Sequence, residues 1–133
     1  MSLLNIAKKA AEAVEKKATE MGLSAAICVL DTSGHITFMV RMTGAGLLSV
    51  RMAQAKAYTS ALFGMATADL MPLVQPGQPL YGLPSALGGE IIAFGGGVAV
   101  REGPNLIGGL GVSAGTIEQD IELANAGIAA ASA

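Results

Sequence analysis

Residues 91–116, IIAFGGGVAVREGPNLIGGLGVSAGT, decide the fold because they join a glycine-rich run to the start of a helix. Within this stretch Gly109, Gly111 and Ala114 have the G-x-G-x-x-A spacing that is typical of dinucleotide-binding loops. Such a site also needs a second parallel strand with an acidic residue about 20 positions later. The sequence ends at Ala133, inside the helix predicted after this stretch, and offers no such strand. We therefore expect the glycines to serve turns and close backbone approach in hairpins.

Within this stretch the pattern predicts three strands, over residues 91–94, 98–101 and 106–112, with EGPN as a turn. A last helix is predicted over residues 117–130, because Thr116 and Gln119 have the spacing of a capping box. The free N–H groups at the start of that helix would form an anion site at Gly115 and Thr116, with Ser113 beside it.

The preceding residues predict a helix, a hairpin and a second helix. Apolar residues recur at helical spacing over residues 3–21 and again over 48–63, and Gly22 and Gly64 end these patterns. Between the helices, AAICVL and HITFMVRM flank the turn DTSG, where Asp31 can bond the backbone and Gly34 can take positive φ. Thr67 and Asp69 can start one short helical turn. Residues 70–90 contain too many prolines for regular structure, which is typical of a lid, a binding segment or an arm that packs on a neighbour.

Strands that sit together in hairpins favour a mainly antiparallel sheet with helices on both faces. We predict an α/β fold of the α+β type, a profilin-like three-layer α/β/α sandwich with a mainly antiparallel five-stranded sheet. The length of 133 residues predicts one domain, residues 1–133.

The composition excludes several classes of partner. Hydrophobic residues make up 52% of the chain and charged residues only 14%, and the net charge of −2 comes without a basic cluster, so no nucleic-acid binding is expected. The uncharged stretch before Glu90 has four prolines and is no membrane span. No export signal opens the sequence, which predicts a cytoplasmic protein. The one cysteine, Cys28, is predicted to be a buried thiol.

Few residues could carry chemistry. The one histidine, His35, lies at a hairpin tip, and we predict no catalytic residue and no metal ligand there. Arg41 and Lys56 stand in apolar surroundings and need partners. One interpretation is that they pair with Asp31, Asp69 or Glu90, or extend to water by their aliphatic stems. The other is that they form a cationic pocket for a carboxylate-bearing ligand. The predicted ligand-binding residues of that pocket are Arg41, Lys56, Tyr58, Tyr81, Ser113, Gly115 and Thr116.

Apolar side chains of the middle third indicate self-association. Residues 42–90 carry several that are expected at the surface, namely Met42, Met52, Met65, Met71, Leu80 and Leu83. A monomer rarely leaves so much apolar surface bare, so we predict a homo-oligomer of closed symmetry.

Five blocks carry a resemblance to a known family. They are VLDTSGHITFMVRMTGA, AQAKAYTSA, QPGQPLYG, FGGGVAVREGPNLIGGLGVSAGT and EQDIELANAG. Together they resemble the GlcG/HbpS family of haem-degrading domains, most closely the C-terminal domain of PduO-type corrinoid adenosyltransferases and the small OrfY-like proteins of diol and glycerol dehydratase operons.

The resemblance implies a profilin-like domain whose dimers build to a tetramer or octamer, with haem or another tetrapyrrole-like ligand as cofactor. Arg41 and Lys56 would then pair with haem propionates. Family members that hold iron through histidine have it in the first helix, and residues 3–21 contain none. Iron ligation would fall to Tyr58, Tyr81, a methionine or His35.

Three functions follow from these observations. The first is a non-catalytic accessory or binding protein for a haem-like or corrinoid-related ligand. The second is a small enzyme that acts on an organic acid, with Arg41 or Lys56 holding the carboxylate. The third is an assembly module without a small ligand.

Overall fold

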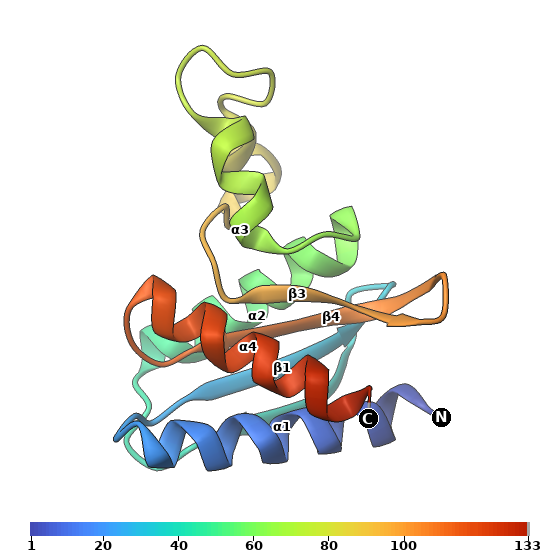
Figure 1. Cartoon of the computed structure of the whole chain (residues 1–133). Coiled ribbons are helices and arrows are strands. Elements are labelled where there is room, and N and C mark those ends of the chain that lie inside the picture. The colour runs from blue at the N-terminus through green and yellow to red at the C-terminus, as the bar shows by residue number, and fades with distance from the viewer. Residues whose placement is uncertain (133) are drawn as a thin grey trace.

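A computed structural model describes residues 1–132 and shows a four-stranded sheet between two helical layers (Figure 1). Helices α1 and α4 cover one face of the sheet and α2 covers the other, which confirms the predicted α/β/α sandwich. The elements are α1 (Leu3–Glu20), β1 (Ala26–Asp31), β2 (Ile36–Arg41), α2 (Leu47–Phe63), α3 (Thr67–Leu70), the 3-10 turns η1 (Met71–Val74) and η2 (Leu83–Gly89), β3 (Gly97–Glu102), β4 (Asn105–Ser113) and α4 (Ile117–Ala131). No helix within residues 1–132 is long and apolar enough to cross a membrane.

Local side-chain bonds set the ends of these elements where the sequence predicts them. At the β1–β2 turn, Asp31 Oδ1 accepts the N–H groups of Ser33 at 2.9 Å and of His35 at 3.0 Å. At the start of α4, Thr116 and Gln119 cap each other's backbone in a complete capping box. These bonds satisfy backbone donors that the helix and hairpin leave open.

The sheet has four strands in the order β2-β1-β4-β3, all antiparallel, so the prediction of five strands is wrong. Residues 91–94 are the segment that forms no strand. Instead Ile92 N–H donates to Thr59 Oγ1 on α2 at 3.0 Å, and Ile91 is buried against Leu70. A side chain of α2 therefore accepts a backbone N–H of this segment, and β3 and β2 are the two edge strands of the sheet.

The glycines of β4 let α2 lie directly on the sheet. A Cβ on Gly109 would collide with the backbone oxygen of Ala57, and a Cβ on Gly111 would collide with that of Ala53. Because both glycines lie inside a paired strand, the G-x-G-x-x-A spacing serves close packing of a helix and not a phosphate loop.

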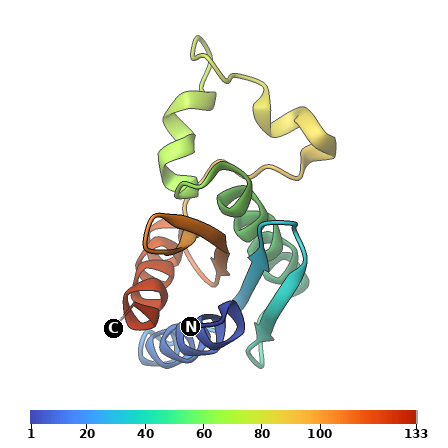
Figure 2. The ribbon, with the colours of Figure 1, turned by 90° about the vertical axis from the view of Figure 1, so that its right-hand side faces the viewer.

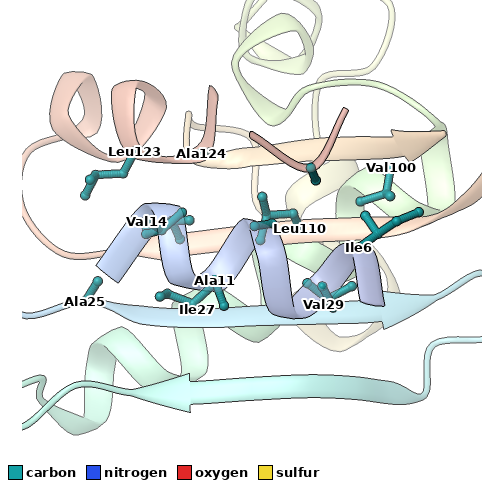
Figure 3. Packing of buried hydrophobic residues seen from close by; sticks show 14 of the residues in the cluster. Ile6, Ala11, Val14, Ala25, Ile27, Val29, Val100, Leu110, Leu123 and Ala124 are labelled. Atoms are coloured by element: carbon teal, nitrogen blue, oxygen red, sulfur yellow. The ribbon is translucent and has the colours of Figure 1, made fainter. Parts of the chain in front are cut away.

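The main core fills the layer between the sheet and α1 with α4 (Figure 3). Val14 of α1, Leu123 of α4 and Ile27 and Leu110 of the sheet are each at most 1% exposed. A smaller core of Ala53, Ala57 and Cys28 lies under α2. The alanines and glycines of this second layer account for the close approach of α2.

Residues 71–90, here called the arm, extend away from the sandwich (Figures 1 and 2). Its base is held by Leu70, Ile91 and Ala93, against which Met65, Val74 and Leu83 pack. Beyond the base the arm exposes large apolar side chains, namely Met71, Leu73, Leu80, Tyr81 and Leu87. The arm thus carries apolar surface that the rest of the chain does not cover.

Candidate functional site

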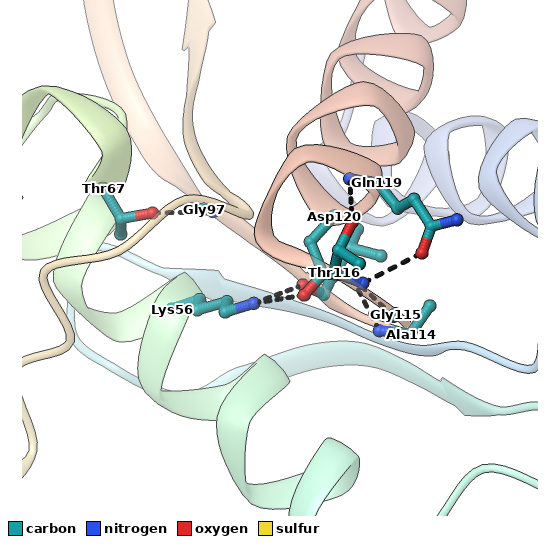
Figure 4. A network of polar contacts seen from close by, with 9 residues as sticks. Lys56, Thr67, Gly97, Ala114, Gly115, Thr116, Gln119 and Asp120 are labelled. Carbon is teal, nitrogen blue, oxygen red and sulfur yellow. Dashed lines mark hydrogen bonds and ion pairs between the residues drawn. The ribbon is translucent and has the colours of Figure 1, made fainter.

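A buried ion pair joins the two helical layers beside the start of β3 (Figure 4). Lys56 Nζ of α2 lies 2.7 Å from Asp120 Oδ2 of α4 and donates to the backbone oxygen of Val112 at 3.1 Å. Lys56 is 1% exposed and Asp120 is 3% exposed. Asp31, Asp69 and Glu90 were the partners that the sequence suggested, and Asp120 is the partner that the structure shows.

The glycine run before β3 makes room for this pair. A Cβ on Gly96 would lie 2.6 Å from Lys56 Nζ and 3.0 Å from Asp120 Cβ. The Lys56 ammonium also lies 5.7 Å from the centre of the Phe94 ring, a distance at which the ring face attracts a cation. The pair is therefore enclosed by backbone and by an aromatic ring.

The predicted anion site at the start of α4 is occupied by the chain's own side chains. Asp120 Oδ1 accepts the N–H groups of Ala114 at 2.8 Å and Gly115 at 2.9 Å, and Gln119 Oε1 accepts that of Thr116 at 2.9 Å. Ser113, the last residue of β4, is half-buried beside them. A ligand anion here would have to displace the Asp120 carboxylate.

Arg41 and Tyr81 lie apart from this pair. The Arg41 guanidinium is bonded to the backbone oxygen of Ala45 at 2.8 Å, at the exposed end of β2. Tyr81 is on the arm and is 67% exposed. Arg41 and Lys56 share no acceptor, and a binding role for either of them stays a prediction.

Tyr58 alone among the predicted ligand-binding residues lines a cleft that we call the hairpin cleft. It has a volume of about 350 Å³ and lies between the β1–β2 hairpin and α2, with Glu90 at the end of the arm on its rim. A Cβ on Gly34 would lie 3.8 Å from the Tyr58 ring, so the ring packs on the hairpin turn. The lining residues are Leu30, Gly34, Ile36, Arg51, Gln54, Ala55, Tyr58 and Glu90.

Sequence reasoning missed Arg51, Gln54 and Glu90 as members of this cleft. Arg51, Gln54 and Tyr58 follow one another at three- and four-residue spacing, so one face of α2 presents all three. That spacing was the available signal. Glu90 has no such local signal, because it follows the arm and reaches the α2 side of the cleft only in the folded chain.

The titratable groups near the cleft differ in their environments. The His35 N–H and other backbone donors of the turn hold the pKa of Asp31 below its usual range. The His35 side chain is 82% exposed, with Nδ1 3.7 Å from Asp31 Oδ2. Burial raises the pKa of the Cys28 thiol to about 12. Within the part of the chain that the structure describes, no three His, Cys, Asp or Glu side chains are grouped to share a metal ion.

Comparison with known proteins places this architecture among relatives. A model of the family described as haem-degrading protein HbpS-like matches residues 3–129. The corrinoid adenosyltransferase PduO of Salmonella typhimurium is 41% identical over 118 residues, which are 89% of this chain and 35% of PduO. A 15.0 kDa protein from the dhaT-dhaS intergenic region of Citrobacter freundii is 41% identical over 121 residues, which are 91% of this chain and 85% of that protein. The chain thus spans only about a third of the PduO relative.

Solved structures agree with the sandwich. The ORFY protein of Klebsiella pneumoniae superposes with a TM-score of 0.95 and 39% identity, covering 99% of this chain and 91% of that one. The PduOC:heme complex has a TM-score of 0.92 and 38% identity, with 98% and 94% covered. A structure of HbpS has a TM-score of 0.86 and 27% identity, with 96% and 88% covered.

Proposed function

Because the chain belongs to the HbpS-like family of haem-degrading proteins, we propose that it is a small, non-catalytic binding protein for haem or a related tetrapyrrole. The observation that carries the proposal is the hairpin cleft, where apolar walls, an aromatic ring and a guanidinium converge. The relative named for its heme complex, PduOC, supports the ligand class.

The cleft fits one edge of a planar, carboxylate-bearing macrocycle. Its volume of about 350 Å³ lies within the range of small-molecule sites, and Leu30, Ile36 and Ala55 supply apolar walls. Arg51 supplies a guanidinium, whose planar fork suits a carboxylate. Arg41 and Tyr81 are proposed to contact parts of the ligand that extend beyond the cleft.

The donors near the cleft suit haem iron in part. Tyrosine, histidine, methionine and thiolate are the usual protein ligands of this iron. Tyr58 lines the cleft, and His35 lies between the lining residues Gly34 and Ile36. Cys28 does not qualify, because it is fully buried and its raised pKa keeps it a neutral thiol. Haem, when bound, would supply the iron centre and two propionate carboxylates.

A hemin titration followed by absorbance tests this proposal. We expect a shift of the Soret band that saturates near one hemin per chain. Tyr58→Phe should alter the shifted spectrum if the phenol oxygen reaches the iron, and His35→Gln should do so if the imidazole does. Glu12→Gln, on α1 at the opposite face of the sheet, is the control and should leave the spectrum unchanged. A titration curve of the unaltered protein that equals free hemin in buffer would refute the proposal.

We also propose that the arm mediates self-association into dimers, which build to a tetramer or octamer. Its exposed apolar side chains support this, since a monomer would leave them in water. A link to diol or glycerol dehydratase operons, or to glycolate-type operons, stays a prediction.

A further inference from the structure

The hairpin cleft holds two opposite charges that come from distant parts of the chain. Arg51 lies in the first half of α2, and Glu90 follows η2 at the end of the arm. Both side chains line the cleft, and both residues are exposed. The cleft therefore has a cationic and an anionic group on its walls.

Neither charge has an ion partner among residues 1–132. The ion pairs there are Met1 with Glu102, Lys17 with Glu122, His35 with Asp31, and Lys56 with Asp120. Among these residues, no N–O distance of 4.0 Å or less joins Arg51 to a carboxylate or Glu90 to a cationic group. Both are thus available to a ligand that enters between them.

Two further polar side chains line the cleft beside these charges. Gln54 and Tyr58 share the face of α2 with Arg51, and the Gln54 amide is already bonded to Met39 Sδ at 3.4 Å. The two charges are therefore the strongest polar groups that the cleft offers. A carboxylate is attracted to Arg51, whereas an ionised Glu90 only accepts hydrogen bonds.

We infer that Glu90 is a specificity-determining residue of the hairpin cleft, which selects a ligand edge with one carboxylate beside a hydrogen-bond donor such as a primary amide. This inference rests on the proposed tetrapyrrole function and narrows its ligand class. A second carboxylate next to the one that Arg51 holds is repelled by Glu90, whereas an amide N–H donates to it. Rejection of this kind sets specificity through a repulsive contact.

The effect is modest because both charges are exposed to water. Interactions between exposed charges are weak and are screened by salt. We expect a preference of about two- to fivefold between matched ligands that differ in one charge. The preference should shrink toward one in 1 M NaCl, where the screening length is about 3 Å.

The experiment compares hemin with hemin monoamide, in which one propionate is a primary amide. Dissociation constants of both probes are measured for the unaltered protein, Glu90→Gln and Arg51→Gln. Glu12→Gln is the control, since it removes a carboxylate of the same length from α1, on the opposite face of the sheet. We expect the monoamide to bind the unaltered protein more tightly, and Glu90→Gln to abolish the difference by strengthening hemin binding.

The remaining outcomes separate this inference from the proposed function. Arg51→Gln should weaken both probes, and Glu12→Gln should keep the preference. Equal affinities in the unaltered protein, or an unchanged ratio in Glu90→Gln, would overturn the role of Glu90 while tetrapyrrole binding stands. If neither probe binds, the proposed function fails and the inference fails with it.

Discussion

The Lys56 ammonium is stabilised by groups from three parts of the chain. Asp120 supplies the opposite charge, Val112 a backbone oxygen and Phe94 a ring face. A buried charge without such partners costs several kcal/mol, which explains why the apolar segment AQAKAYTSA tolerates a lysine. The sequence showed that Lys56 needed a partner. It could not identify Asp120, because 64 positions separate the two residues and they belong to opposite layers.

Breaking the pair should destabilise the fold strongly. Asp120→Asn leaves the Lys56 ammonium buried beside a neutral amide, and Lys56→Met leaves the carboxylate without its cation. We expect each change to lower the free energy of unfolding by about 3–5 kcal/mol in urea denaturation. The double variant should lose less than the sum of the two single losses.

The exposed ion pair of Lys17 with Glu122 is the control for this experiment. Its atoms lie 3.4 Å apart, but the side chains are 37% and 55% exposed. Lys17→Met should change the free energy of unfolding by no more than about 1 kcal/mol. Equal losses for Lys56→Met and Lys17→Met would contradict the importance assigned to burial.

At the scale of elements, local signals predicted the helices and the hairpins. Caps such as Thr116 with Gln119, and turns such as Asp31 with Gly34, act within a few residues and are legible in the sequence. The prediction of a fifth strand failed because the composition of residues 91–94 is typical of a strand. In the structure the hydroxyl of Thr59 on α2 instead accepts a backbone N–H of this segment. A contact across 33 positions has no local signature. The same reason hid Glu90 from the predicted site.

The close contact of α2 with β4 gives a prediction about glycine. In Gly111→Ala the added Cβ would meet the backbone of Ala53 and lie 2.6 Å from Ala57 N, so helix and strand must move apart. We expect a loss of about 1–3 kcal/mol in the free energy of unfolding. Gly46→Ser, at the start of α2, is the control, because its Cβ meets nothing within 4 Å and serine is a good helix cap. A Gly111→Ala protein as stable as the Gly46→Ser protein would contradict this, because it would show that α2 and β4 can move apart without loss of stability.

At the scale of the whole molecule, the sequence predicted only part of the exposed apolar surface correctly. Leu80 is exposed on the arm, whereas Met52 and Leu83 are half-buried. The first residues of α2 add Leu47 and Leu48, which are 76% and 75% exposed and which the sequence pattern does not mark as surface residues. Periodicity marks a helix as apolar, but it does not tell which apolar side chains remain uncovered.

Polar substitutions on the arm should reduce the size of the assembly. In Leu80→Gln with Tyr81→Gln, two apolar contacts of the arm are lost, and analytical ultracentrifugation should report a smaller species at micromolar concentration. Gln78→Ala, an exposed arm residue without an apolar surface to lose, is the control. An unaltered protein that sediments as a monomer at that concentration would exclude self-association through the arm.

Two threonines fix the places where the arm leaves and rejoins the sandwich. Thr67 Oγ1 accepts the Gly97 N–H at 2.9 Å, Thr59 Oγ1 accepts the Ile92 N–H at 3.0 Å, and both threonines are at most 1% exposed. The tip between these anchors can therefore accept insertions, because doubling the length of the segment costs only about 0.6 kcal/mol of loop-closure entropy. Related chains can therefore differ in the sequence of the arm tip, and so in what the tip contacts, while the sandwich stays the same.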